Sequence, residues 1–340
     1  MRNKFLYLIS IIIIFLISAV LVTMWLFRER HAQDQPVLEK LNVGITLSDY
    51  SVFITIADSQ GFFTKNGLTV NPKQYQSGSL AYTYLLQGEV DVATMAESAL
   101  VIRSFEKGFD QAEIGILSTV ATADIHELIA RKDRGIEQIS DLKGKKIGIS
   151  RKTSMEFFLT TFLILNHLSQ TDVTIVDLSP PKLVDALANG EIDAVLTWDV
   201  YAYQARDRLG KNAVSWPAQS GHNFFWLAIG KQDTLISKAQ AVERFLKGLI
   251  EAEEFVKTHN SEAKSLYIKS WNRDPAYGDY LWPRMNFHVS LNQSLIVAME
   301  DEAKIMVKTY YSGKKIPSYF NMVYTEALGR VNPKRIEIFR

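Results

Sequence analysis

Residues 85–98 read LLQGEVDVATMAES and residues 187–200 read LANGEIDAVLTWDV, so one pattern occurs twice in the chain. Both copies contain Leu-x-x-Gly-Glu-x-Asp, then an apolar run, then a carboxylate nine residues after the glycine. The glycine is suited to the left-handed C-cap of a helix, and the apolar run after the aspartate is typical of a short buried strand. The repeat therefore predicts two halves that are built alike.

The segments before each copy also correspond. Before the first copy the expected elements are a strand, a helix, a strand and a turn, at residues 41–46, 52–65, 68–75 and 77–79. Before the second copy the same order is expected at residues 146–150, 155–168, 173–178 and 179–181. Two βαβαβ units are thus predicted, each a parallel-type sheet flanked by helices. Ligands bind at the carboxyl ends of the strands in such sheets, so a binding site is expected at the strand-to-helix junctions.

The N-terminal segment predicts export to the cell envelope. Residues 1–4 would be a short cytoplasmic tail, and the apolar run at residues 5–27 would span about 34 Å as a helix, enough to cross a bilayer. This run is longer than the core of a cleavable signal peptide, and no Ala-x-Ala site follows it, which favours an uncleaved signal-anchor over secretion after cleavage. Residues 28–40 are polar and aperiodic and are expected to be a tether. The remaining chain is expected on the extracytoplasmic side, in the periplasm or at the cell surface.

Composition excludes several classes of protein. The chain of 340 residues has no cysteine, so disulfides, thiolate metal sites, a cysteine nucleophile and a lipidated cysteine anchor are excluded. The formal net charge of +1 argues against nucleic acid as a partner. With 47% apolar residues, the chain can bury a large core without cross-links. We expect a monomer that needs no cofactor and no metal.

The order of the motifs resembles a known family. An aromatic helix is followed by Gly-Phe-Phe-x-Lys-x-Gly-Leu-x-Val at residues 61–70, a Gly/Ser turn, and then Leu-x-x-Gly-Glu-x-Asp-Val. This order is similar to that of the solute-binding proteins of ABC importers for nitrate, sulfonates and taurine. The segment DLKGKKIGIS at residues 141–150 resembles the start of the family's second lobe, and the likeness covers most of residues 41–335. The same family shares a domain with the thiamine-pyrimidine synthases.

The resemblance implies an α/β, two-lobed, periplasmic-binding-protein-like fold of type II that closes on its ligand. Residues 41–125 are expected to begin lobe 1, residues 126–222 to form lobe 2, and residues 223–340 to return to lobe 1 with C-terminal helices. Strands are expected within residues 114–133, with a polar break at residues 121–124, and again within residues 222–233. The two passages between the lobes would form a two-strand hinge, because strand ends absorb backbone rotation without disturbing either core.

Motifs of catalysis were sought and are missing. The sequence has no Walker-type phosphate loop, no His-Glu-x-x-His and no Gly-x-Ser-x-Gly. Its six histidines show no pair at helical spacing, and only His222, near the expected hinge, stays a candidate for ligand contact. No nucleophile, base and orienter can be assembled from the junction residues. The synthases of the family carry a cysteine-rich motif, so the lack of cysteine disfavours that activity, and we expect no enzyme.

The candidate ligand-binding residues lie at the junctions and near the hinge. Several offer hydroxyl groups or free backbone N–H groups at helix N-termini, where partial positive charge attracts electron-rich groups. The alternative is that these side chains, with Ser48 and Ser79, only cap helices. The candidates are Asp49, Tyr50, Ser77, Gly78, Glu97, Ser98, Thr122, Thr153, Ser154, Trp198, Asp199 and His222.

The nature of the ligand depends on the carboxylates. Glu97 and Asp199 end equivalent strands and are expected to face one shared groove; otherwise the receptor interpretation would fail and the recurring motif would be a coincidence. A carboxylate at the mouth favours a ligand with an amine or ring nitrogen, such as an aminosulfonate or a pyrimidine-like compound, over plain nitrate. Aromatic residues such as Tyr50, Trp198 and Trp226 would stack on a flat or cationic group, or fill the cores.

The sequence thus predicts a non-enzymatic receptor that binds a small organic molecule and presents it to an ABC permease in the membrane. Two other classes remain open. One is a ligand-sensing ectodomain that serves a partner signalling protein, and a co-purifying histidine kinase would favour it. The other is an enzyme similar to the thiamine-pyrimidine synthases, which product formation from a bound ligand would favour.

Overall fold

The computed structural model describes residues 38–219 and 221–339. The expected cytoplasmic tail at residues 1–4, the membrane span at residues 5–27 and most of the tether lie outside the described residues. No helix in the described ranges has both the length and the apolar character that crossing a bilayer requires.

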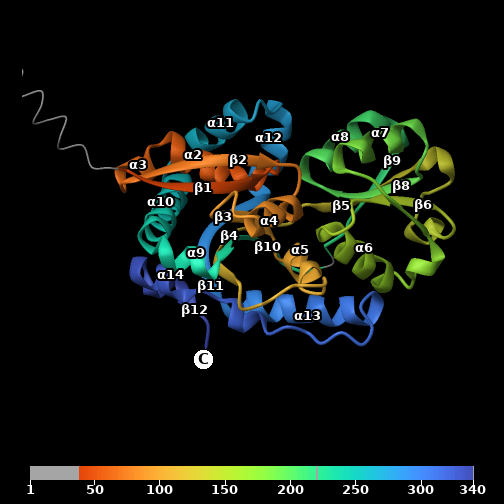
Figure 1. The fold of residues 1–340 in the computed structure, drawn as a ribbon. Helices are drawn as coiled ribbons and strands as arrows, with labels where there is room; N and C mark the ends of the chain where they lie inside the picture. Colours follow the sequence, from red (N-terminus) through yellow and green to blue (C-terminus); the bar gives the residue numbers. More distant parts are fainter. Residues whose placement is uncertain (1–37, 220, 340) are drawn as a thin grey trace, which may run out of the picture. The chain divides into compact units, whose positions relative to one another are not determined.

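The larger sheet belongs to a part of the chain that we call lobe 1 (Figure 1). Its strands are β1 (Glu39–Thr46), β2 (Leu68–Tyr75), β3 (Val92–Ala96), β4 (Ile114–Ala123), β10 (Phe224–Lys231), β11 (Met285–Asn292) and β12 (Ile336–Glu337). In the described residues these seven strands follow the order β12-β11-β4-β10-β3-β1-β2. β1 runs parallel to β2 and β3, whereas β10 runs antiparallel to β3 and β4.

The smaller sheet belongs to lobe 2. Its strands are β5 (His126–Arg131), β6 (Lys146–Ile149), β7 (Thr174–Asp177), β8 (Ala194–Trp198) and β9 (Ala213–Pro217). In the described chain these five strands follow the order β7-β6-β8-β5-β9, with β6 parallel to β7 and β8 and with β5 antiparallel to β8 and β9. Both sheets are therefore mixed rather than purely parallel, because the strands next to the lobe crossings run antiparallel to the βαβαβ cores.

Helices flank both sheets. The helices of lobe 1 are α2 (Val52–Ser59), α3 (Phe62–Lys65), α4 (Gly78–Leu86), α5 (Glu97–Arg103), α9 (Gln232–Ser237), α10 (Ala239–Thr258), α11 (Asn260–Ser270), α12 (Pro275–Leu281), α13 (Gln293–Thr309) and α14 (Thr325–Val331). The helices of lobe 2 are α6 (Ser154–Leu165), α7 (Pro180–Asn189) and α8 (Asp199–Leu209). Short 3-10 turns are η1 (Asp49–Ser51), η2 (Lys132–Arg134), η3 (Ile139–Leu142), η4 (Gln170–Asp172), η5 (Gly210–Asn212), η6 (Trp282–Arg284), η7 (Tyr319–Met322) and η8 (Pro333–Arg335).

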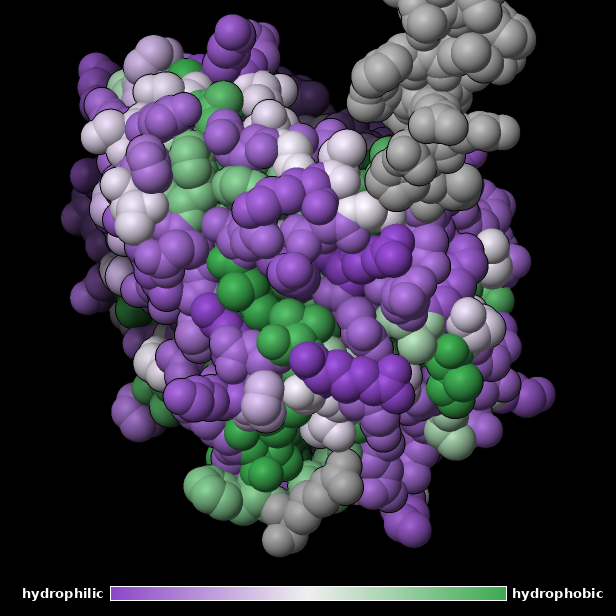
Figure 2. Space-filling model, turned by 90° about the vertical axis from the view of Figure 1, so that its left-hand side faces the viewer, coloured by the Kyte–Doolittle hydropathy of each residue, from purple (hydrophilic) through white to green (hydrophobic). Residues whose placement is uncertain are grey.

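The C-terminal helices complete lobe 1. Helix α10 packs against α2 and α14, and α13 contacts α5 and also α6 of lobe 2. Inside this packing Phe63 stacks on Phe245, with ring centroids 5.6 Å apart. Figure 2 shows the side of lobe 1 that carries α3, α10 and α14, where hydrophilic residues cover most of the surface and hydrophobic residues form small patches. Most large apolar side chains of the lobe are therefore turned inward.

The repeated motif performs the same task in both lobes. The order β2-β1-β3 in lobe 1 corresponds to β7-β6-β8 in lobe 2. Gly88 and Gly190 both adopt the left-handed backbone, with φ of 76° and 77°. Asp91 Oδ2 accepts from the N–H of Asn42 over 2.8 Å, and Asp193 Oδ2 accepts from the N–H of Lys146 over 2.9 Å. The motif thus ends a helix and then fixes the third strand to the start of the first.

The chain passes between the lobes twice. The first passage separates β4 from β5 at residues 124–125, so β4 continues through most of the polar break that was expected at residues 121–124, and the second passage separates β9 from β10. β4 and β10 pair with each other in the sheet of lobe 1. Both passages therefore leave from one strand pair, as a hinge of two chain segments requires.

Candidate functional site

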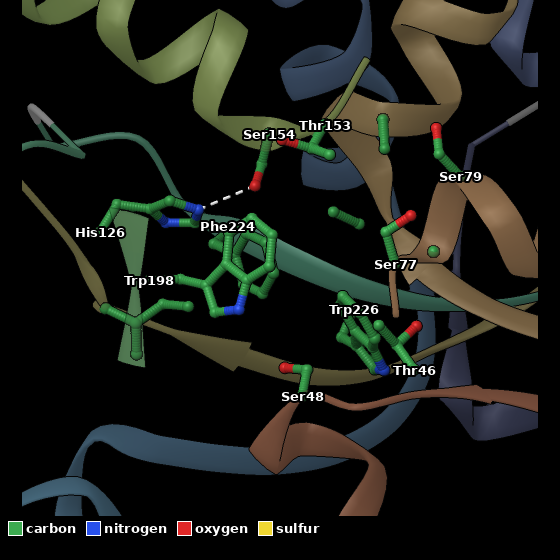
Figure 3. A pocket seen from close by; sticks show the side chains of 14 residues that line it. Thr46, Ser48, Ser77, Ser79, His126, Thr153, Ser154, Trp198, Phe224 and Trp226 are labelled. Carbon is green, nitrogen blue, oxygen red and sulfur yellow. Dashed lines mark hydrogen bonds between the residues drawn. The ribbon is translucent and has the colours of Figure 1, made fainter. Parts of the chain in front are cut away.

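A small cavity of about 30 Å³ lies between the two lobes. Its walls come from the ends of β1, β3 and β8, from the starts of α4 and α6, and from β5 and β10 (Figure 3). The lining residues are Thr46, Ser48, Ser77, Gly78, Ser79, Ala96, Ala99, Ile125, His126, Thr153, Ser154, Trp198, Phe224 and Trp226. The cavity therefore occupies the strand-to-helix junctions, where the fold places ligands.

Helix α4 presents a free N-terminus to this cavity. Ser77 caps it with extended backbone and accepts from the N–H of Leu80 over 3.3 Å, and no acidic residue stands in its first turn. A Cβ at Gly78 would lie 2.5 Å from the Cβ of Met95, so only glycine allows the helix this close to β3. The uncompensated N-terminus favours a negatively charged or electron-rich group.

Helix α6 also begins at the cavity, but its N-terminus is already partnered. Thr153 caps it, because its Oγ1 accepts from the N–H of Met155 over 3.3 Å. Glu156 in its first turn accepts from the N–H of Lys152 over 3.1 Å. The positive end of this helix therefore meets a carboxylate of the chain itself.

Two indole groups provide unused donors. Trp198 comes from lobe 2 and Trp226 from lobe 1, and they are only 7% and 5% exposed. Within the described part of the chain, neither indole nitrogen has a hydrogen-bond partner. None of the described residues that line the cavity is acidic or basic apart from His126. Because buried donors without partners are rare, these two N–H groups indicate a ligand with acceptor atoms.

His126 is part of a hydrogen-bonded chain at the other side of the cavity. Its Nε2 lies 2.8 Å from Ser154 Oγ, and its Nδ1 lies 3.2 Å from Gln219 Oε1. Burial lowers the pKa of His126 to about 3, so the ring is neutral at physiological pH. A hydroxyl, an imidazole and an orienting amide are therefore assembled here, which the sequence analysis held to be absent. Their spacing along the sequence gave no sign of it, since the three residues lie on different elements.

Direct contacts between the lobes hold the cavity closed. Ser79 donates its hydroxyl to the carbonyl of Lys152 over 2.6 Å, and Lys152 Nζ lies 2.9 Å from Glu106 Oε1. Farther along the boundary, the hydroxyls of Thr160 and Tyr310 lie 3.2 Å apart. These contacts join lobe 2 to lobe 1 beside the cavity.

The structure brings five of the predicted residues to the cavity wall. They are Ser77, Gly78, Thr153, Ser154 and Trp198. All five stand directly at strand-to-helix junctions. The other predicted residues lie behind the wall or at the lobe boundary.

Asp49 and Tyr50 lie beneath the cavity. Asp49 Oδ1 accepts from the hydroxyl of Tyr267 over 2.8 Å and from Nε of Arg273 over 2.7 Å, and its Oδ2 accepts from the hydroxyl of Tyr277 over 2.5 Å. Tyr50 packs against Trp226, with ring centroids 5.8 Å apart. Asp49 therefore ties α11, α12 and the segment between them to the end of β1, and Tyr50 packs behind the aromatic wall.

Asp199 lies at the boundary between the lobes. Its Oδ2 is 3.4 Å from the hydroxyl of Ser48 in lobe 1, and its Oδ1 accepts from the N–H of Val200. Burial, together with the negative charge of Asp49, raises the pKa of Asp199 well above its usual value. Asp199 therefore contacts the opposite lobe through Ser48, which itself lines the cavity.

The expectation that Glu97 faces the same groove as Asp199 is wrong. Glu97 is fully buried, and its Oε2 accepts from the N–H of Phe225 over 2.9 Å. Its neighbour is the buried Glu302 on α13, and burial raises the pKa of Glu97 to about 8. The carboxyl points into lobe 1 because α13 covers the start of α5. The preference for an amine-bearing ligand that was based on Glu97 therefore loses its support. The dependence of the receptor class and of the repeat on this carboxylate was also wrong, because Asp91 and Asp193 make equivalent bonds in both lobes.

The last three predicted residues also lie outside the cavity wall. Ser98 follows Glu97 in α5, and its buried hydroxyl has no hydrogen-bond partner among the described residues. Thr122 on β4 accepts from Asn286 Nδ2 over 3.4 Å. His222 lies in the second lobe crossing, with its ring edge on Phe157 at 5.4 Å.

Several wall residues were not among the predicted ones. Ser48, Ser79 and Trp226 lay in segments that the sequence singled out, as capping or aromatic residues. His126 and Phe224 were missed, because each stands where a hinge passage meets a strand and carries no local motif. Within the described residues no group of three or more His, Asp or Glu side chains is arranged to hold a metal ion.

Two α/β lobes, two crossings and a cavity between the lobes define the class of protein. The alkanesulfonate-binding protein SsuA from Xanthomonas axonopodis pv. citri, solved with MOPS, matches with a TM-score of 0.70 at 17% identity, over 84% of this chain and 98% of that one. The expected periplasmic-binding-protein fold is thereby confirmed. The desulfurization enzyme DSZB also matches, with a TM-score of 0.60 at 14% identity, over 87% of this chain and all of that one. The fold alone therefore does not separate binding from catalysis.

Residues 48–263 match the family described as NMT1/THI5 like, so the chain belongs to that family. A putative aliphatic sulfonates-binding protein of Bacillus subtilis is 24% identical over 83% of this chain and 85% of its own length. The taurine-binding periplasmic protein of Escherichia coli is 23% identical over 64% of this chain and 67% of its own length. These sequence relatives are named as binding proteins, in line with the predicted class.

Proposed function

We propose that this chain is the extracytoplasmic solute-binding component of an ABC importer and that its cavity takes a small organic sulfonate. The unpartnered indole N–H groups of Trp198 and Trp226 carry the proposal. One comes from each lobe, so a single oxyanion that accepts from both would hold the lobes together. The free N-terminus of α4 adds backbone N–H groups and partial positive charge on the same wall.

The relatives support this choice of ligand. The Bacillus subtilis and Escherichia coli proteins are named for sulfonates and taurine, and the Xanthomonas structure holds MOPS, itself a sulfonate. A sulfonate needs no basic side chain when dipoles and neutral donors surround it in a dry site. The contacts that Ser79 and Lys152 make across the lobe boundary would then hold the ligand-bound protein in one conformation that a permease can recognise.

A ligand-release assay tests the proposal. Protein refolded from denaturant to remove bound ligand should gain thermal stability with alkanesulfonates and should bind them in calorimetry. Trp226→Phe keeps the ring but removes the N–H group, so the sulfonate affinity should fall about tenfold. Trp216→Phe, on β9 and outside the cavity wall, is the matched control and should bind like the wild type. Failure of every sulfonate to bind, or equal behaviour of both variants, would contradict the proposal.

Delivery to a permease and attachment to the membrane are further parts of the proposal. Residues 5–27 would hold the chain on the membrane, with residues 28–40 as the tether. The full chain should then sediment with the membrane fraction, and deletion of residues 1–27 should release it. Cells without the chain should take up a labelled sulfonate more slowly.

A hydrolytic enzyme is the second candidate. The hydroxyl of Ser154 is hydrogen-bonded to the imidazole of His126, and the amide of Gln219 orients that imidazole, as in a catalytic triad. The low pKa of His126 makes it a poor proton acceptor, so we favour binding. Prolonged incubation with the bound sulfonate, followed by mass spectrometry, separates the two candidates. Unchanged ligand favours the receptor, and a Ser154-dependent product favours the enzyme.

A further inference from the structure

The amide of Gln219 is held in one orientation by the two lobe crossings. Its Oε1 accepts from the backbone N–H groups of Ile125 and His126 over 2.5 and 3.1 Å. Its Nε2 donates to the carbonyls of Ala123 and His222 over 2.8 and 3.2 Å. Because N–H groups only donate and carbonyls only accept, these four contacts determine which end of the amide is oxygen.

This orientation determines where the proton sits on His126. The Nδ1 atom lies 3.2 Å from Gln219 Oε1, which only accepts, so Nδ1 carries the hydrogen. The neutral ring then has its lone pair on Nε2. Ser154 Oγ lies 2.8 Å from Nε2 and therefore donates its single hydroxyl hydrogen to His126.

The polarity of the cavity follows from this chain of bonds. The Ser154 hydroxyl has no second hydrogen, so it offers only lone pairs to the cavity that it lines. In Figure 3, Ser154, His126 and Trp198 lie at one side of the drawn group, whereas Trp226, Thr46 and Ser77 lie at the other. The first side thus combines the lone pairs of Ser154 with the indole N–H of Trp198. The second side has donors at Trp226 and the start of α4, while Thr46 has already donated its hydroxyl hydrogen to the carbonyl of Thr94.

Resting on the proposed function, we infer that Ser154 is a specificity-determining residue that selects sulfonates whose opposite end carries a hydrogen-bond donor, a hydroxyl or an ammonium group. His126 and Gln219 are positioning residues, because they act through the hydroxyl of Ser154. A methyl group in place of the donor leaves the lone pairs of Ser154 without a partner in a dry cavity. Sites built to pair with a polar group discriminate strongly against analogues that lack it.

The experiment compares ligands of equal size that share the sulfonate. Isethionate, taurine and 1-propanesulfonate differ only in a terminal hydroxyl, ammonium or methyl group. For the wild-type full chain, calorimetry should show that isethionate or taurine binds at least about tenfold tighter than 1-propanesulfonate. Of isethionate and taurine, the ligand whose affinity exceeds that of 1-propanesulfonate by the larger factor shows whether the cavity prefers a hydroxyl or an ammonium donor.

Three variants connect this ratio to the hydrogen-bonded chain. In Ser154→Ala the ratio should fall to about one, because the acceptor is gone. Ser154→Thr keeps a hydroxyl and should restore the preference. His126→Phe fills the same space but frees the hydrogen of Ser154, so the preference for donor-bearing ligands should also fall. A variant that only distorts the cavity would weaken all three ligands alike and leave the ratio of their affinities unchanged. A fall in this ratio therefore reports the loss of the acceptor.

The outcomes are distinguishable. If the wild type binds sulfonates without preferring a donor, or if Ser154→Ala weakens all three ligands equally, the inference is wrong and the proposed function stands. If none of the three sulfonates binds, the proposed function fails, and the inference fails with it.

Discussion

Glu97 and Asp199 occupy equivalent places in the two repeated units, and each directly follows the third strand of its lobe. Both carboxyl groups are fully buried with a raised pKa, and each lies near a second carboxyl group, Glu302 or Asp49. The partner of Glu97 comes from α13 within lobe 1, whereas the partner of Asp199 lies in the opposite lobe. Duplication therefore preserved the backbone and the burial, while later parts of the chain decided what each carboxyl meets.

The difference separates stability from ligand binding. Glu97 and Glu302 stay together whether the lobes are open or closed, because both belong to lobe 1. Asp199 meets Ser48 and Asp49 across the lobe boundary, so under the proposed hinge closure this contact would form only when the lobes close. The titration of Glu97 is thus linked to folding, and the titration of Asp199 is linked to closure.

The largest expected effect concerns Glu97. Its folded-state pKa of about 8 lies above the usual 4.5, so the folded chain keeps a proton that the unfolded chain releases. The contribution is fully present below pH 4.5 and is lost as the pH rises to about 8, at up to about 1.4 kcal/mol per pH unit. In Glu97→Gln this slope should become shallower in denaturant unfolding measured across pH, because only the buried Glu302 then keeps a raised pKa. The exposed Glu89→Gln is the control, and an unchanged slope in Glu97→Gln would show that the carboxyl is ionised in the fold.

The second prediction tests the shared task of Asp91 and Asp193. Replacing either by alanine removes the acceptor of a strand N–H that lies near the surface and should lower the free energy of unfolding by about 0.5–1.5 kcal/mol. Asp91 also pairs with Lys238 at 2.8 Å, so Asp91→Ala should cost more than Asp193→Ala. The asparagine variants keep an acceptor and should be milder. A negligible loss of unfolding free energy in Asp193→Ala would contradict the equivalent roles of Asp91 and Asp193 in the two lobes.

The third prediction concerns Asp199 and closure. Burial and the charge of Asp49 raise the pKa of Asp199, although Arg273 nearby offsets part of that charge. Under the proposed hinge closure, closing the lobes should therefore take up a proton. Ligand affinity should be greatest at low pH and fall, by up to about tenfold per pH unit, as the pH rises through the closed-state pKa. Asp199→Asn should flatten this profile in calorimetry across pH, and the exposed Asp207→Asn should not. A steep profile in Asp199→Asn would assign the proton to another group.

The smallest expected effect is the difference between two glycine variants. Gly44 on β1 and Gly148 on β6 are equivalent, and both face the helix that precedes the third strand of their lobe. A Cβ at Gly148 would lie 2.5 Å from Ile192 and 2.8 Å from Leu183, whereas at Gly44 the nearest atom is 3.2 Å away, on Tyr75. Thermal unfolding should show a loss of about 1–3 kcal/mol for Gly148→Ala and less for Gly44→Ala. The reverse order would mean that the flexible ends of Ile192 and Leu183 move aside.

Local patterns predicted the junction residues well. Thr153, Ser154 and Trp198 reach the cavity because each stands at the end of a predicted strand or the start of a predicted helix, and the fold brings such positions to one edge. Glu97 satisfied the same criterion and still points away. Its environment depends on Glu302, about two hundred positions later, and no pattern near residue 97 reports the position of α13.

His126 shows the opposite case. Its function was not recognised, because the six histidines were judged by their spacing to one another, and a single histidine in a strand carries no motif. Its role depends on Gln219 in the second crossing and on Ser154 in another element. Residues that are far apart in the sequence and become hydrogen-bond partners only in the folded chain produce no periodic pattern by which they could be recognised.

The sequence by itself determined the duplicated βαβαβ units, the two-lobed fold and the place where the site lies, because glycine caps, apolar periodicity and strand ends are local properties. Only the tertiary structure decided which polar groups face the cavity and with what polarity. The physical reason is that a buried side chain turns toward whichever partner satisfies it. For Glu97, Asp199 and Ser154 those partners come from distant segments or from the other lobe.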